Sequence, residues 1–315
     1  NKFLSTTSAF LLSTSMLVAD VPKVTVDIAP VHSLVSKVMN GIGKPDLIIP
    51  AGASPHEYQL KPSNAQSLED ADIVFWIGED LTPWLEKGLS SLAQDSSITS
   101  LLGVDGIELL TFREGALFEA HDHDDHDDHG KKKHDDHDDH DDHEGHAHGE
   151  HDPHAWLSPQ IAKVWLNVVA AKLSEVDPDN AAKYFSNAKS ARDNVDSLVS
   201  EVNSILDPIR DKKFVVFHDA YQYFERDFGI SASGAISLGD ASDPSPARLS
   251  EIRRRVVDEA VQCVLAEPQY DPGLVKSVVE GTDAKTTVID PLGVSLETGP
   301  NLYENLIRNL ATNLA

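Results

Sequence analysis

The sequence predicts an α/β protein with mainly parallel strands, arranged as two lobes that are joined by one long helix. Short apolar runs alternate with amphipathic segments along the chain, which is typical of strands linked by crossing helices. The same alternation starts again after residue 213. Between the two stretches, apolar residues recur at every third or fourth position from about 177 to 206, which indicates a single helix.

The first lobe is predicted over residues 20–176. Strands are expected at 24–28, 46–49 and 73–77, with helices over 31–39 and from about residue 62. Another helix is expected to begin at Ser158-Pro159 and to run through Leu173. Serine is a favourable N-cap, and proline fits the first helical position.

The connecting helix is predicted over 177–207 and the second lobe over 208–315. About 28 residues at ~1.5 Å each give roughly 42 Å, so we expect a stiff connector that permits only small movements of the lobes. In the second lobe we expect strands at 214–217, 230–236, 264–266 and 287–289, and helices at about 246–260, 271–281 and 301–313.

Residues 1–19 have the pattern of a partial export signal. Lys2 precedes an apolar stretch that ends near Ala19 and is too short for a transmembrane helix. Cleavage near Ala19 leaves a mature chain that starts near Asp20. We therefore expect an exported, soluble protein.

The charge balance argues against a nucleic-acid partner. The 315 residues include 26 Lys and Arg against 52 Asp and Glu, for a net charge of −26. Phosphate binding needs clustered Lys and Arg, whereas this chain is acidic both within residues 121–151 and outside them. Cations are the more natural ligand.

Residues 121–151 are built from Asp-His and Asp-Asp-His units, with 11 His among 31 residues. So many polar side chains cannot enter a packed core, and neutral imidazole is a good ligand for zinc, copper and nickel. We interpret the segment as a flexible, metal-gathering loop; the alternative is a solvated acidic spacer. Its candidate ligands are His121, His123, His126, His129, His134, His137, His140, His143, His146, His148 and His151.

Outside this segment, three His and one Asp lie after predicted strands or in connecting loops. His56 follows the strand at 46–49, His154 precedes the helix at Ser158, His218 directly follows the strand at 214–217, and Asp290 follows the strand at 287–289. Ligands of α/β sheets bind beyond the carboxyl ends of the strands. Three nitrogens and one carboxylate meeting in a cleft would suit a tetrahedral zinc ion. Each residue alone could equally cap a helix or hold a turn, as we expect for His32.

Five ordered motifs carry a resemblance to a known family. They are Gly52-Ala53-Ser54-Pro55-His56-Glu57-Tyr58, Asp152-Pro153-His154-Ala155-Trp156-Leu157-Ser158-Pro159, Phe217-His218-Asp219-Ala220-Tyr221, Ala266-Glu267-Pro268-Gln269 and Ile289-Asp290-Pro291-Leu292-Gly293. With them, the chain resembles the metal-specific solute-binding proteins of bacterial ABC importers, in particular the periplasmic zinc-uptake type. The resemblance implies two Rossmann-like lobes bridged by a rigid helix, with the metal site in the cleft between the lobes.

The resemblance also implies the ligand set. His56, His154 and His218 take the positions of zinc ligands, and Asp290 takes that of a carboxylate ligand in manganese-type relatives. In zinc-type relatives the fourth position is water or another carboxylate. A His at position 218 favours zinc, because manganese-type relatives resemble a Glu there. Some relatives have a Glu directly before the first His, where this chain has Pro55, with Glu57 on the other side.

Cys263, the only cysteine, has two interpretations. It could be a small buried residue of the strand around 264–266. The resemblance instead implies a disulfide partner near the C-terminus, beyond Ala315.

The function that follows is capture of Zn2+, the transported ligand, in the periplasm by a monomer, and its delivery to an ABC permease at the inner membrane. The segment 121–151 would then collect, store or sense zinc. Alternatives are a manganese-type binding protein and a metal-dependent adhesin or buffer. A zinc hydrolase is disfavoured because no His-Glu-x-x-His or Gly-x-Ser-x-Gly motif occurs, so we expect no enzyme.

Overall fold

The computed structural model describes residues 21–113, 118, 151–237 and 244–315. The predicted export signal lies outside these residues. So does the predicted metal-gathering segment, except for His151.

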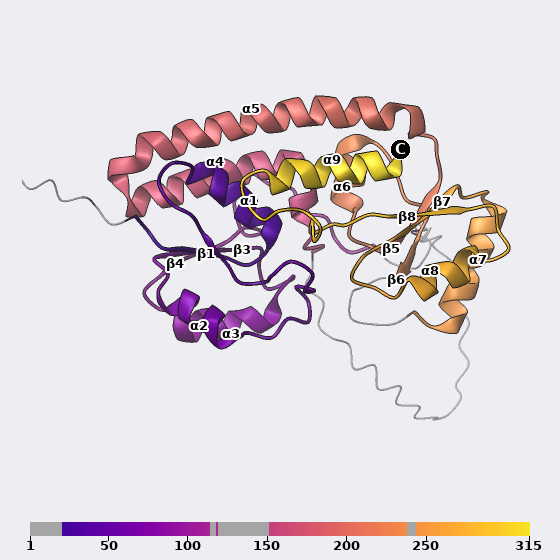
Figure 1. Cartoon of the computed structure of the whole chain (residues 1–315), viewed down its shortest axis with the longest axis horizontal. Helices are drawn as coiled ribbons and strands as arrows, with labels where there is room; N and C mark the ends of the chain where they lie inside the picture. The colour runs from indigo at the N-terminus through magenta and orange to yellow at the C-terminus, as the bar shows by residue number, and fades with distance from the viewer. Residues whose placement is uncertain (1–20, 114–117, 119–150, 238–243) are drawn as a thin grey trace, which may run out of the picture.

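In the described part of the chain, two parallel sheets form the centres of two lobes (Figure 1), so the predicted fold class is confirmed. The first sheet has the strand order β2-β1-β3-β4 and the second has the order β6-β5-β7-β8. The first-sheet strands are β1 (Val24–Val26), β2 (Asp46–Leu47), β3 (Ile73–Trp76) and β4 (Ser97–Ser100). The second-sheet strands are β5 (Phe214–His218), β6 (Ala235–Ser237), β7 (Cys263–Ala266) and β8 (Lys285–Val288).

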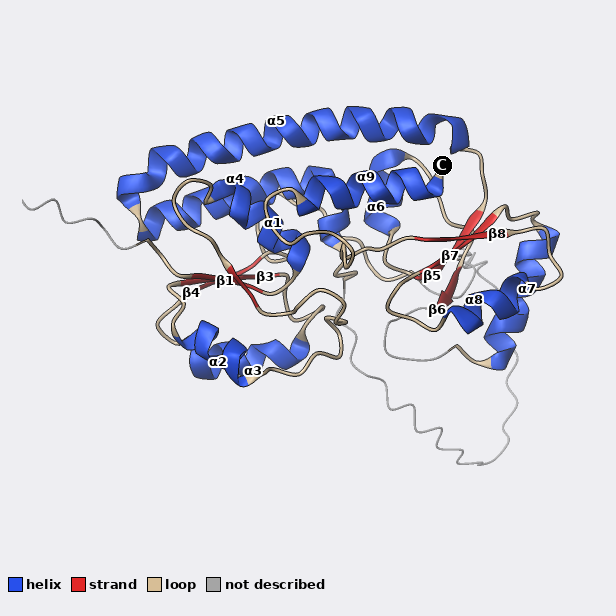
Figure 2. Cartoon of the chain, viewed as in Figure 1, coloured by secondary structure: helices blue, strands red, loops and turns tan. Residues whose placement is uncertain are grey.

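Helices cover both faces of the sheets, as Figure 2 shows. Three of the central strands are therefore buried at every residue, namely β1, β3 and β5, and most of their residues are apolar. The described helices are α1 (Ala29–Val38), α2 (Pro62–Glu69), α3 (Pro83–Leu92), α4 (Pro159–Val176), α5 (Ala181–Leu206), α6 (Gln222–Phe228), α7 (Pro246–Asp258), α8 (Pro272–Val279) and α9 (Leu302–Leu314). Short 3-10 turns lie at Ala155–Leu157, Pro178–Asn180 and Asp207–Ile209.

The long helix α5 runs across both lobes (Figure 1). Its buried residues step by three or four positions, and they face α4, α9 and α1. Helix α9 follows the last strand of the second lobe, yet it also packs against α1 of the first. One hydrophobic core accordingly contains residues of both lobes, including Val26 and Phe214. This shared core favours small lobe movements over a wide hinge.

Some elements differ from the prediction. Strand β6 begins at Ala235 rather than near residue 230; Ile230 and Ala232 are buried, but they lie in an irregular segment ahead of the strand. Helices α3 and α6 and strand β4 were not predicted. β4 is an edge strand of sequence Ser-Ile-Thr-Ser, without an apolar run, and α6 spans only seven residues. No described helix is both long enough and apolar enough to cross a bilayer.

Candidate metal centre

The strand orders place a topological switch point in each sheet. After β1 the chain first forms β2 on one side of β1 and then β3 on the other side. In the second sheet it likewise forms β6 on one side of β5 and then β7 on the other side. Such points are where α/β sheets bind ligands, beyond the carboxyl ends of the strands. In the second sheet, two polar side chains stand at this point: His218 is the last residue of β5, and Glu267 directly follows β7.

His218 is held by Glu267. Its ring atom Nδ1 lies 2.8 Å from Oε1 of Glu267, and its backbone N–H donates to the same oxygen at 3.4 Å. Both residues are buried. A carboxylate oxygen accepts, so Nδ1 is the donor of this hydrogen bond and Nε2 is the ring nitrogen that points away from Glu267. This is the arrangement that fixes the orientation and basicity of metal-binding His residues.

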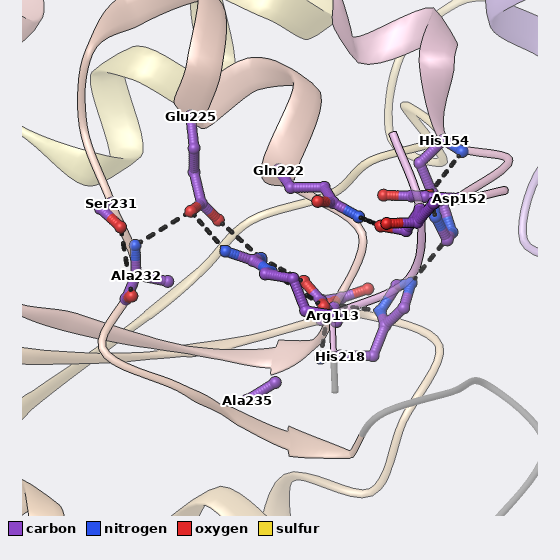
Figure 3. A network of polar contacts seen from close by, with 12 residues as sticks. Arg113, Asp152, His154, His218, Gln222, Glu225, Ser231, Ala232 and Ala235 are labelled. Atoms are coloured by element: carbon purple, nitrogen blue, oxygen red, sulfur yellow. Dashed lines mark hydrogen bonds and ion pairs between the residues drawn. The ribbon is translucent and has the colours of Figure 1, made fainter. Parts of the chain in front are cut away.

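His154 has the same arrangement on the opposite wall. It lies just before the turn Ala155–Leu157, and its Nδ1 is 2.7 Å from Oδ1 of Asp152. The backbone N–H of His154 donates to the same oxygen at 2.9 Å (Figure 3). Asp152 is fully buried. Nε2 of His154 is therefore the ring nitrogen that points away from its carboxylate, as in His218.

The Nε2 atoms of the two rings face one another. Nε2 of His154 lies 3.4 Å from Nε2 of His218. A tetrahedral zinc ion at ~2.0–2.1 Å from each nitrogen places two ligand nitrogens about 3.3–3.4 Å apart. The pair therefore already has the spacing of two zinc ligands.

His56 approaches this pair from the turn between β2 and α2. Its ring centroid lies 5.7 Å from that of His154, and its backbone N–H donates to Oγ of Ser54 at 3.3 Å. The indole of Trp84 donates to the carbonyl of Pro55 at 2.8 Å, which fixes the turn. All three imidazoles line one pocket. Its walls are Ser54, Pro55, His56, His154, Trp156, His218, Glu267, Gln269, Tyr270, Pro291 and Leu292.

Asp290 lies beside this pocket but does not line it. Its carboxylate accepts hydrogen bonds from the backbone N–H groups of Leu292 and Gly293, at 3.0 Å each, and from that of Val294. The structure thus brings the three predicted His together and uses Asp290 to hold the turn that supplies one wall. Among the described residues, no three His, Cys, Asp or Glu side chains are already arranged to hold a metal ion.

Two further residues from the sequence analysis lie elsewhere. Nε2 of His32 is 3.0 Å from the carbonyl of Pro45, and burial lowers the pKa of His32. It lies inside α1 and caps no helix. Cys263 begins β7 as a half-buried free thiol in the described chain, and burial raises its pKa.

The sequence analysis missed the two carboxylates that orient the imidazoles. Asp152 and Glu267 stand in the quoted motifs, but neither was given a role. The available signals were a carboxylate two residues before His154, and a carboxylate at the end of a strand beside that of His218. Burial and the Glu267 carboxylate also raise the pKa of Tyr221 well above its usual value.

Comparison with known proteins identifies related chains over almost the whole length. Residues 24–315 match the family model described as zinc-uptake complex component A, periplasmic. The high-affinity zinc uptake system protein ZnuA of Brucella abortus strain 2308 is 47% identical over 98% of this chain and 95% of that protein. The protein of the same name from Paracoccus denitrificans is 46% identical over 94% of this chain and 92% of that protein.

Solved structures share the fold. A crystal structure of ZnuA superposes with a TM-score of 0.73 at 21% identity, over 94% of this chain and all of that one. A laminin-binding adhesin of Streptococcus agalactiae, solved as a mutant, gives a TM-score of 0.73 at 21% identity, over 93% of this chain and all of that one. At this identity the likeness extends to the fold alone.

Proposed function

The chain belongs to the family of the periplasmic component A of zinc-uptake complexes, and we propose that it captures Zn2+ with His56, His154 and His218. The function follows from the family: capture of zinc in the periplasm for an ABC importer. Zinc is the cargo of the protein rather than a resident cofactor. The ligand residues are our own assignment.

The observation that carries the assignment is the contact between His154 and His218. With both Nδ1 atoms directed at carboxylates, the two Nε2 atoms face one another across 3.4 Å. Two ring nitrogens at this distance need a shared proton or a shared metal ion between them. Imidazole nitrogen suits zinc better than it suits manganese, which prefers oxygen ligands.

His56 completes the set by turning toward the pair. It comes from a loop, whereas His218 ends a strand and His154 is held by a buried carboxylate, so we expect His56 to coordinate last. Asp290 becomes the fourth ligand only if the turn that its carboxylate holds moves toward the pocket, because Asp290 does not line the pocket. Otherwise water takes that position.

The site fits capture better than catalysis. The family is a transport family. A hydrolase needs an open coordination position with a general base aimed at it. The two nearest carboxylates, Asp152 and Glu267, are instead engaged by Nδ1 of the imidazoles. We therefore infer a binding protein without enzymatic activity.

The remaining elements of the proposal concern partners and organisation. We propose that the protein acts as a monomer and passes its zinc to the permease of the importer. We also propose lobe boundaries at residues 20–176 and 208–315, with the connector at 177–207. The His residues of segment 121–151 would act as an auxiliary zinc collector.

A competitive zinc titration tests the assignment. The mature chain is compared with a chain lacking residues 121–149; this deletion keeps His151, which pairs with Thr111. One tight site should survive the deletion and disappear on His154→Ala. The matched control is His32→Gln, which removes an imidazole outside the pocket and should keep tight binding. Tight binding that vanishes with the deletion, or that survives His154→Ala, would refute the assignment.

A further inference from the structure

The two segments that flank residues 114–150 pair with each other next to the metal centre. Thr111 and His151 form an antiparallel bridge, and the backbone N–H of Asp152 donates to the carbonyl of Leu110 at 2.8 Å. The hydroxyl of Tyr223 ties both sides together, because it accepts from the N–H of Leu110 at 3.0 Å and donates to the carbonyl of Asp152 at 2.8 Å. We call residues 110–113 and 151–152 the stem. Tyr223 belongs to α6, so the stem rests on the second lobe.

Arg113 fastens the stem to that lobe. Its Nε lies 2.9 Å from both carboxylate oxygens of Asp219, and its Nη2 also contacts Asp219. Nη1 and Nη2 donate to Glu225 at 2.8 and 3.1 Å. The face of the guanidinium lies 3.7 Å from the ring centroid of Phe118. One side chain therefore joins two acidic residues in a fixed plane, as a guanidinium does and an ammonium cannot.

The cluster is buried, so its partners depend on one another. The side chains of Asp219 and Glu225 are 2% and 5% exposed, and that of Arg113 is 19% exposed. Burial raises the pKa of both carboxyls, and the guanidinium counteracts this by pairing with their charged forms. Loss of Arg113 would leave two buried carboxylates without their cation.

The same cluster reaches both walls of the metal centre. Asp219 is the residue after His218, and Asp152 at the other end of the stem accepts from Nδ1 of His154 at 2.7 Å. Figure 3 shows Arg113 between Glu225 and the two imidazoles. Arg113 therefore links the two imidazoles indirectly. On one side it binds Asp219, the neighbour of His218, and on the other side it belongs to the stem, whose residue Asp152 binds His154.

We propose that Arg113 is a positioning residue for zinc, which holds His154 at coordinating distance from His218 by fastening the stem to α6. The proposal rests on the proposed function. Arg113 does not touch the metal. Without it the stem keeps only its hydrogen bonds to Tyr223 and Gln222 of α6, so Asp152 holds the ring of His154 less firmly and zinc is released faster.

The experiment measures the zinc dissociation rate into excess chelator and the Kd, with melting temperatures recorded on the apo protein. Arg113→Met should release zinc about tenfold faster, which is the lower end of the effect of outer-shell partners. The zinc release rate of Arg113→Lys should lie between those of Arg113→Met and the parent, because lysine keeps the charge but lacks the planar group that binds both carboxylates. The matched control is Arg308→Met, which removes another arginine that binds a carboxylate twice, at 2.8 and 2.9 Å, far from the site. It should leave release unchanged.

A purely structural role for Arg113 is tested by Arg113→Met combined with Asp219→Asn and Glu225→Gln. This variant leaves no unpaired buried charge, so its melting temperature should recover, while its zinc release stays fast. Zinc release at the parent rate, in this variant or in Arg113→Met alone, would overturn the proposal. The result is separate from that of His154→Ala, which reports on the metal site itself.

Discussion

Asp152→Asn is the sharpest test of how the structure prepares His154 for zinc. Both N–H donors of His154, at Nδ1 and at the backbone, reach the same oxygen Oδ1, at 2.7 and 2.9 Å. The amide oxygen of Asn can occupy the place of Oδ1. The substitution therefore keeps the shape and both hydrogen bonds, removes the charge, and places an NH2 group where Oδ2 stands.

The expected loss follows from that charge. A hydrogen bond to a charged group contributes about 1.5–3 kcal/mol, against about 0.5–1.5 kcal/mol for a neutral pair. Because this hydrogen bond is also made without zinc, the difference of about 1–1.5 kcal/mol is the most that its weakening can take from zinc binding. The buried negative charge of Asp152 also attracts the bound cation, which raises the loss to roughly 1.5–2.5 kcal/mol. At ~1.4 kcal/mol per factor of ten, the Kd for zinc should rise about 10- to 70-fold.

The assay is a competitive zinc titration on chains lacking residues 121–149, with apo melting temperatures measured in parallel. The control is Asp177→Asn. Asp177 is also buried, and it accepts from the hydroxyl of Tyr184 at 2.8 Å, away from the metal centre. Asp177→Asn should lower the melting temperature and keep the Kd within about twofold. A Kd of Asp152→Asn within twofold of the parent would refute the argument that this carboxylate prepares His154.

Three further predictions concern buried polar groups. Glu267→Gln should raise the Kd for zinc at least ~10-fold in the same titration, because Glu267 holds Nδ1 of His218 at 2.8 Å; an unchanged Kd would contradict this role. Trp156→Phe should lower the free energy of unfolding in urea by about 1–2 kcal/mol, since the indole donates to the carbonyl of Pro291 at 2.8 Å; unaltered stability would argue against that link between the lobes. Burial raises the pKa of Asp27 to about 7, so the folded state keeps a proton that the unfolded chain releases above pH 3.8. Stability should therefore fall as the pH rises through this window, and the apo parent should lose on the order of 2 kcal/mol between pH 5 and 7.5 relative to Asp27→Asn; parallel pH curves for the two proteins would exclude the raised pKa.

The architecture could be predicted because its elements carry local signals. The buried runs of β3 and β5 and the regular apolar spacing of α5 are visible in the sequence, as is the cap of α4, where Oγ of Ser158 accepts from the N–H of Ile161 at 3.1 Å. The packing of α9 against α1 could not be predicted, because it joins two segments far apart in the chain.

The three His of the candidate site could be nominated because each follows a strand or lies in a loop. What the sequence could not supply is the pairing of atoms. The fold decides that Asp152 and Glu267 direct both Nε2 atoms toward one point. It also decides that the Asp290 carboxylate binds backbone N–H groups of its own turn. The tie between Arg113 and Asp219 spans 106 residues, and no local pattern predicts it.

The most direct test of the three-imidazole site is a crystal structure of the zinc-loaded chain lacking residues 121–149, with anomalous diffraction data at the zinc edge. We predict one strong anomalous peak in the pocket, ~2.0–2.1 Å from a ring nitrogen each of His56, His154 and His218. A peak held by other residues, with these three imidazoles uncoordinated, would contradict it.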